Sequence, residues 1–235
     1  MEVTLKPIGC IQSCYREKFG IPRQPNLVTE ARASLWLEPP FTLDAVRGLE
    51  AFSHVWLIFL FHTTEAQGWH MTVRPPRLGG NKRVGVFATR STFRPNALGL
   101  SVVKLEQIQL VGAQVVLGLS GMDLLDGTPV LDIKPYIPYA DAIPAALAGF
   151  AQQAPPEYPV VFSEQARMDC TQKSAQWNCD INLLIRQILA QDPRPAYRAH
   201  DGLDTRRYAM KLYDFDVHWQ YTTHGIEVLR LNDLS

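Results

Sequence analysis

Seven basic residues occupy a stretch of the sequence that contains no acidic residue. Between Glu65 and Glu106 there is no Asp or Glu, yet the stretch carries Arg74, Arg77, Lys82, Arg83, Arg90, Arg94 and Lys104. One charge sign within a folded, apolar-rich segment is typical of a surface that faces phosphates. The same side chains could instead pair with acidic residues elsewhere in the chain, and composition leaves both interpretations open.

The part of this stretch from Val73 to Ser101 is also rich in glycine and proline. These residues fix the shape of a loop and let the backbone approach a ligand, and the planar guanidinium group of arginine suits carboxylates and phosphates. The segment is therefore predicted to form a binding surface.

A second polar segment places Asp123, Asp126 and Asp132 among turn-forming residues. A carboxylate in such a turn can accept hydrogen bonds from ribose hydroxyls, as acidic residues do in nucleotide sites. Asp followed by Gly is also a strong turn signal, so a purely structural role for Asp126 is an equally good interpretation.

Three histidines, His54, His62 and His70, recur every eight residues. In a strand that rises about 3.3 Å per residue, His54 and His62 would lie roughly 25 Å apart, so they cannot share an ion. No metal site is predicted. His62, at the end of its strand, is better placed to contact a ligand.

Short runs of β-branched and aromatic residues predict that the candidate basic, acidic and histidine residues are positioned by β-strands. The expected strands are 3–11, 33–37, 54–62, 83–89, 101–108 and 115–119, and the strand at 54–62 is expected to be central, with both faces covered. The proline-rich segment 128–159 predicts a domain junction without regular structure. Beyond it we expect a strand at 160–162, a helix containing Ile181 to Leu189, and strands at 207–221 and 226–231.

These elements predict a mainly β fold, with an N-terminal domain at 1–150 and a small α+β C-terminal domain at 160–235. No GxGxxG, GxxxxGK[ST], HExxH or GxSxG motif is present, which disfavours the common nucleotide-binding and hydrolase folds. The net charge is zero, and the longest apolar run, 55–61, is too short to cross a bilayer. The N-terminus lacks the features of a secretory signal, so a cytoplasmic protein is expected. The four cysteines are expected to be free thiols.

Several long segments, in the same order, resemble the TrmO family, which is also called TsaA-like or YaeB-like. They are EKFGIPRQP at 17–25, DAVRGLEAFSH at 44–54, the block 74–101, DGTP at 126–129 and QDPRPAY at 191–197. The resemblance implies a tRNA methyltransferase that transfers a methyl group from S-adenosylmethionine to N6 of N6-threonylcarbamoyladenosine beside the anticodon, at position 37. It also implies a β-barrel that is not of the Rossmann type, and a homodimer with the cofactor near the subunit interface.

The resemblance also implies site residues. The predicted cofactor contacts are Pro22, Arg23, Gln24, His62, Thr63, Arg90, Leu100, Asp123, Leu124, Leu125 and Asp126. Arg90 and Asp126 are the predicted catalytic residues, and the predicted tRNA contacts are Arg74, Arg77, Lys82, Arg83, Arg94, Arg194 and Tyr197. Ala97 stands where the family pattern leads us to expect proline, which loosens one loop position.

Two other classes of function stay open on the sequence. One is a non-catalytic RNA-binding barrel that holds a nucleotide-like ligand, and the other is a small-molecule hydrolase that uses His62 with Asp126. Methyl transfer itself needs mainly alignment of nucleophile, methyl group and sulfur. The sequence does not identify a general base.

Overall fold

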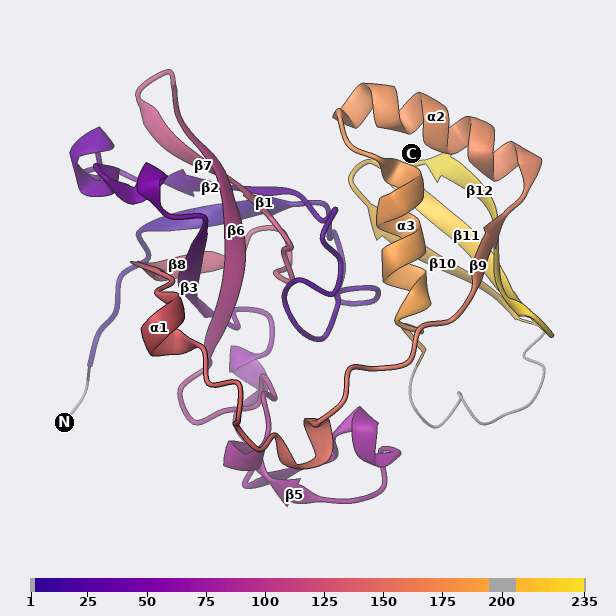
Figure 1. The fold of residues 1–235 in the computed structure, drawn as a ribbon, viewed down its shortest axis with the longest axis horizontal. Coiled ribbons are helices and arrows are strands. Elements are labelled where there is room, and N and C mark those ends of the chain that lie inside the picture. The colour runs from indigo at the N-terminus through magenta and orange to yellow at the C-terminus, as the bar shows by residue number, and fades with distance from the viewer. Residues whose placement is uncertain (1–2, 195–205, 235) are drawn as a thin grey trace. The chain divides into compact units, whose positions relative to one another are not determined.

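The computed structural model describes residues 3–194 and 206–234, which divide into two compact units (Figure 1). The first unit comprises Met1–Gln12, Ser34–Leu119 and Gly127–Ala154, and the second comprises Ser13–Ala33, Ser120–Asp126 and Pro155–Ser235. The sequence predicts contiguous domains instead. The segment 13–33 belongs to the second unit because Tyr15 bridges Leu212 and the amide of Glu30 binds Gln187.

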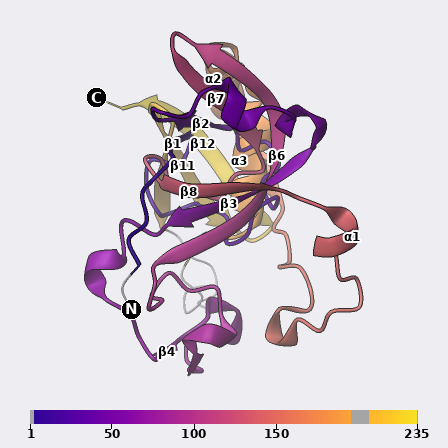
Figure 2. The same cartoon turned by 90° about the vertical axis from the view of Figure 1, so that its left-hand side faces the viewer.

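Within the described residues, six strands close into a barrel, as Figure 2 shows. They are β1 (Gly9–Ser13), β2 (Ala33–Leu37), β3 (His54–Leu60), β6 (Leu98–Val111), β7 (Gln114–Ser120) and β8 (Pro129–Pro135), hydrogen-bonded in the order β1-β2-β7-β6-β3-β8. The antiparallel pairing of Gly9 with Val130 joins β1 to β8. The prediction of a mainly β architecture is confirmed.

Strand β3 pairs with β6 on one side and with β8 on the other, and like every strand of the closed barrel it has two neighbours. Its alternate residues Val55, Leu57 and Phe59 are buried, whereas Trp56 and Ile58 between them are half-exposed. The prediction that both faces are covered is therefore wrong, because this face of the barrel is only partly covered.

Strand β8 lies inside the segment that the sequence predicts to be an irregular junction. Its prolines, Pro129 and Pro135, occupy the two ends of the strand, where a missing N–H costs little, and the residues between them pair with β3. The strand was not predicted because the segment around it is rich in proline.

A long excursion leaves the barrel after β3 and returns at β6. It contains β4 (Thr72–Val73), β5 (Val84–Gly85) and short 3₁₀ turns, among them η4 (Pro76–Leu78) and η5 (Val86–Ala88), so the strand predicted at 83–89 is much shorter than expected. Figures 1 and 2 show β4 and β5 at the opposite end of the barrel from the β6–β7 hairpin. After β8, helix α1 (Pro138–Asp141) and the turn η6 (Gly149–Ala151) follow, and η6 packs against η4.

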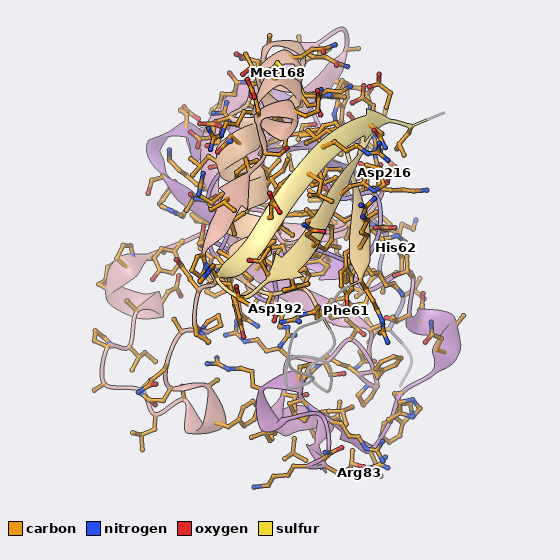
Figure 3. The ribbon with its side chains drawn as sticks, turned by 90° about the vertical axis from the view of Figure 1, so that its right-hand side faces the viewer. Phe61, His62, Arg83, Met168, Asp192 and Asp216 are labelled. Carbon is orange, nitrogen blue, oxygen red and sulfur yellow. The ribbon has the colours of Figure 1, made fainter. Side chains whose placement is uncertain are left out.

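The C-terminal part of the second unit is a sheet in the order β10-β11-β12-β9 with two helices against it. Its elements are β9 (Val160–Phe162), α2 (Glu164–Trp177), α3 (Ile181–Ala190), β10 (Arg207–Leu212), β11 (Phe215–Thr222) and β12 (Gly225–Asp233). Figure 3 shows the face of the sheet that the helices leave open. The α+β character and the helix around Ile181 to Leu189 agree with the sequence prediction.

Two elements of this sheet and its helices differ from the sequence prediction. Helix α2 is missed because only Ala166, Cys170 and Lys173 of its residues are buried, which gives no apolar periodicity. The strand predicted at 207–221 is two strands, because the chain turns at Tyr213 with a positive φ of 48°.

The four cysteines are free thiols, as expected. Burial raises the pKa of Cys179 to about 11 and that of Cys170 to about 12. Among the described residues, no helix has the length and apolar content that a membrane span requires.

Candidate cofactor and RNA-binding residues

The predicted cofactor turn at 123–126 is held by the last residue of β1, Ser13, and by Tyr15 just after the strand. The buried Ser13 hydroxyl donates to the carbonyl of Leu124 at 2.8 Å, and the amide of Ser13 donates to Oδ1 of Asp126 at 2.9 Å. The amide of Asp126 in turn donates to the carbonyl of Tyr15 at 2.9 Å. The turn therefore has a conformation fixed from both its backbone and its side chain.

Both carboxylate oxygens of Asp126 already accept hydrogen bonds inside the protein. Oδ2 forms an ion pair with Nη1 of Arg16, whose Nε also donates to the carbonyl of Tyr213 at 3.0 Å. Side-chain exposure is 42% for Arg16 and 27% for Asp126. This geometry supports the structural interpretation of Asp126, which orders the turn, over a direct grip on adenosine.

Asp123 begins the same turn, and one oxygen of its carboxylate, Oδ1, is buried. Its negative charge acts on the buried phenol of Tyr15. Burial raises the pKa of Tyr15 well above its ordinary value, and the neighbouring Cys14 and Asp123 raise it further. Tyr15 is thus held in its neutral form beside the turn.

The predicted contacts Pro22, Arg23 and Gln24 lie in a loop that is bonded to this turn. The amide of Asn26 donates to the carbonyl of Gly121 at 3.0 Å. Pro22 is buried and Arg23 is exposed. The loop that contains 22–24 is therefore joined, within the second unit, to the residues just before the turn at 123–126.

Gly121 is required for this approach. Its φ is +71°, and a Cβ at this position would lie 2.2 Å from Oδ1 of Asn26. A residue with a Cβ would be strained at this φ and would displace the side chain of Asn26.

In the first unit, His62, Thr63 and Leu100 lie at one end of the β3–β6 pair. The amide of Phe61, the residue before His62, donates to the carbonyl of Ala97 at 2.7 Å, and Phe61 and His62 are labelled in Figure 3. Leu100 is 53% exposed and pairs with Ile58 in the sheet register. His62 follows the end of β3, as predicted.

Arg90 is exposed in the loop between η5 and β6. The loop is ordered by Thr89, whose hydroxyl donates to the carbonyl of Val86 at 2.8 Å and accepts from the amide of Ser91 at 3.2 Å. The predicted cofactor contacts therefore form two sets. One set, in the second unit, has 22–24 and 123–126; the other, in the first unit, has His62, Thr63, Arg90 and Leu100.

The predicted RNA contacts of the first unit lie on the β4–β5 excursion, which we call the basic loop (residues 69–97). Arg74, Arg77, Lys82 and Arg83 are exposed, and Figure 3 shows Arg83 at the outer edge of the loop. The three hydrogen bonds described for these arginines and Arg94 go to neutral oxygens, namely Arg77 to Gln153 O, Arg83 to Thr72 Oγ1 and Arg94 to Thr89 O.

Neutral acceptors order a guanidinium group without cancelling its charge. Lys104, outside the basic loop, does pair with an acid, because its Nζ lies 3.0 Å from the carboxylate of Glu106. The acid-free stretch thus remains a strongly positive surface in the basic loop, as the phosphate-facing interpretation requires.

Arg194 differs from the other predicted RNA contacts. Its side chain is 6% exposed, and its Nε and Nη2 donate to the two carboxylate oxygens of Asp192 at 2.9 and 2.8 Å. Its guanidinium also lies 3.5 Å from the ring centroid of Tyr221. The carboxylate of Asp192 and the ring of Tyr221 engage this guanidinium group inside the protein, which argues against the predicted phosphate contact of Arg194. Tyr197 lies outside the described residues.

Sequence reasoning missed an exposed aromatic residue in the basic loop. Phe87 is 77% exposed, next to Val86, which is 1% exposed. The signal was a phenylalanine between basic residues in a loop rich in glycine and proline, which was assigned to a strand instead.

Neither a metal centre nor a hydrolytic pair gains support from the geometry. Within residues 3–194 and 206–234, no group of three or more His, Cys, Asp or Glu side chains could hold a metal ion. Asp126 is bonded to Ser13 and Arg16 within the second unit, whereas His62 belongs to the first unit.

Comparisons with known proteins place both units in one family. The model for the tRNA-methyltransferase O N-terminal domain matches residues 10–142, and the model for the TrmO C-terminal domain matches residues 155–234. The chain is 52% identical over 227 residues to the tRNA (adenine(37)-N6)-methyltransferase of Escherichia coli, covering 95% of each chain.

Two further relatives agree. A putative S-adenosylmethionine-dependent methyltransferase of Pseudomonas aeruginosa is 53% identical, with 94% of each chain covered. A crystal structure of TrmO from the same organism is 47% identical, has a TM-score of 0.82 and covers 99% of this chain and 98% of that one. The chain therefore belongs to the tRNA-methyltransferase O family.

Proposed function

We propose that this protein is an S-adenosylmethionine-dependent tRNA methyltransferase that modifies N6 of the adenosine at position 37. The observation that carries the proposal is the match of both family models, in order, together with 52% identity to a named enzyme of this activity over 95% of each chain. The finer substrate, N6-threonylcarbamoyladenosine, is part of the proposal and follows from the resemblance of the sequence motifs.

The side-chain types in the two predicted cofactor sets fit S-adenosylmethionine. The donor carries a carboxylate, an adenosine and a reactive sulfonium methyl group, which it supplies to the target nitrogen. An exposed cation such as Arg90 or Arg23 suits the carboxylate, and the turn at 123–126, whose conformation is fixed by Ser13, is assigned to the adenosine. We propose that Asp126 acts on the cofactor by fixing this turn.

Residues of the protein must also stabilise the charge that develops on the target nitrogen. The carbamoyl group delocalises the lone pair of N6, so the nitrogen reacts best as its proton leaves. A nearby cation stabilises the anion that develops. We assign this role to Arg90, which is exposed on an ordered loop.

The tRNA is held by the basic loop through its phosphates. We also propose that the protein is a cytoplasmic homodimer. Support for the dimer comes from three exposed apolar side chains in α1 and the segment after it, namely Tyr139, Ile143 and Leu147, which are 90%, 71% and 93% exposed. So many exposed apolar side chains in one segment are typical of a surface that another chain covers.

The test of the activity uses labelled S-adenosylmethionine and two tRNA preparations, one carrying the threonylcarbamoyl group and one lacking it. Label in the modified tRNA alone supports the full proposal, and label in both supports methylation with a broader substrate. Label in neither, with no heat of cofactor binding by calorimetry, rejects the proposal.

The role of Arg90 is tested by Arg90→Ala. Because the side chain is exposed, the melting temperature should change little, while methyl transfer should fall at least tenfold. Arg47→Ala, an exposed arginine of the same unit outside the site, is the matched control. Wild-type turnover in Arg90→Ala would remove Arg90 from the mechanism.

A further inference from the structure

We propose that Phe87 and Arg94 form a platform in the basic loop on which an unpaired base of the RNA substrate stacks. This inference rests on the proposed function and adds a base contact to a surface so far assigned only to phosphates.

The exposure of Phe87 is imposed by its neighbours. In η5, the side chain of Val86 is buried and its amide donates to the carbonyl of Met71 at 3.1 Å, which anchors the turn. The next side chain along the turn must then face outward. A phenylalanine that is 77% exposed on an ordered turn presents a large apolar surface to solvent.

Arg94 is fixed to the same turn. Its Nη1 donates to the carbonyl of Thr89 at 2.8 Å, and the amide of Thr89 donates to the carbonyl of Val86 at 3.1 Å. The guanidinium carbon lies 5.9 Å from the ring centroid of Phe87. The ring and the cation are therefore preorganised next to each other.

An aromatic ring beside a guanidinium plane, within a positive surface, is the chemistry that recognises single-stranded RNA. Aromatic and guanidinium planes stack on unpaired bases, and nearby cations hold the flanking phosphates. Arg74 and Lys82 are exposed on the same loop. An anticodon loop supplies unpaired bases and phosphates together.

The charge of the loop argues against a second copy of this chain as the occupant. In a symmetric contact the same surface of both copies would meet, and the acid-free stretch would face its own positive charge. RNA is the partner whose charge is complementary.

The test compares Phe87→Ala, Phe87→Trp and the control Phe52→Ala, an exposed phenylalanine of the same unit outside the loop. Affinity for an anticodon stem-loop RNA is measured by fluorescence anisotropy at several salt concentrations. Phe87→Ala should bind roughly 5- to 100-fold more weakly, Phe87→Trp should bind like the wild type, and Phe52→Ala should be unchanged. The salt dependence should stay the same in Phe87→Ala, because no phosphate contact is lost.

The outcome is separate from that for the proposed function. If the wild type methylates modified tRNA and Phe87→Ala binds the stem-loop with unchanged affinity, the platform is rejected and the activity stands. If light scattering shows that Phe87→Ala changes the oligomeric state, the ring belongs to an interface between copies and the platform is also rejected. If the wild type does not methylate, the proposed function itself fails.

Discussion

The sequence predicts that the arginines of the basic loop and Arg194 all contact RNA. In the structure their hydrogen-bond partners are of opposite kinds. Three arginines of the loop, Arg77, Arg83 and Arg94, are held by neutral oxygens. Arg194 is buried, bound to a carboxylate and stacked on a ring. A motif rich in arginine therefore predicts a phosphate surface only where no acid is close enough to use the charge inside the protein.

The pKa shifts of Asp192 and Arg194 show that the two groups stabilise each other's charge. Burial alone would raise the pKa of Asp192, but hydrogen bonds from Arg194 and Tyr221 more than offset it, so the pKa lies below its ordinary value. Burial would lower the pKa of Arg194, and the hydrogen bonds to Asp192 raise it above its ordinary value. Each group keeps the other charged.

The largest effect is expected from Arg194→Ala. The substitution leaves the carboxylate of Asp192 buried without its cation, which should lower the free energy of unfolding by about 3 to 5 kcal/mol. Chemical denaturation measures this loss. The exposed pair of Arg47 and Asp44 gives the matched control, since Arg47→Ala should change stability by less than about 1 kcal/mol.

RNA binding by the same variant provides the discriminating measurement. At a temperature where Arg194→Ala is still folded, the salt dependence of RNA binding should equal that of the wild type. A weaker salt dependence with unchanged stability would show that Arg194 does contact phosphate and would reverse the comparison.

The next effect in size is expected in the basic loop. Arg74→Ala and Lys82→Ala should each weaken RNA binding and lower the slope of log affinity against log salt by about one, because each removes one phosphate contact. Both residues are exposed, so unfolding should change little. Lys134→Ala, an exposed lysine on β8 that pairs with Asp132, is the control and should leave the slope unchanged.

Arg16 lies between the two classes, because it is partly exposed but paired with Asp126. Arg16→Ala should reduce stability by at most about 1 kcal/mol. It should raise the KM for S-adenosylmethionine several-fold with less effect on kcat, since the turn at 123–126 loses the ion pair that helps to fix its conformation. Arg16→Lys should restore part of the affinity. An unchanged KM in Arg16→Ala would remove the positioning role.

The sequence predicts some of these features and not others for identifiable reasons. The apolar spacing of Ile181, Leu184 and Ile188 specifies α3, and the acid-free stretch specifies the basic loop. Helix α2 has no such spacing, because its buried face includes Lys173, which pairs with Asp214 at 3.2 Å. That pairing spans 41 residues and leaves no local trace.

The candidate site also has features that the sequence predicts and features that depend on tertiary contacts. Local motifs locate the turn at 123–126, but the use of Asp126 depends on Ser13 and Arg16, which are more than 100 residues away in sequence. Arg194 is the reverse case. Its partner Asp192 is two residues away and visible in the sequence, but the burial of the pair is a tertiary property.

The smallest effect concerns pH. Because the pKa of Asp192 is lowered in the folded state, its pairing contributes stability above the ordinary value of 3.8 and loses it as the pH falls through the lowered pKa. The difference in unfolding free energy between the wild type and Asp192→Asn should therefore be constant near neutral pH and shrink below pH 3.8. Asp44→Asn, which removes the same charge from an exposed pair, controls for net charge. A difference that shrinks already between pH 5 and 8 would mean that another group titrates with the pair, and the tight coupling of Arg194 to Asp192 would no longer explain why this arginine is withheld from RNA.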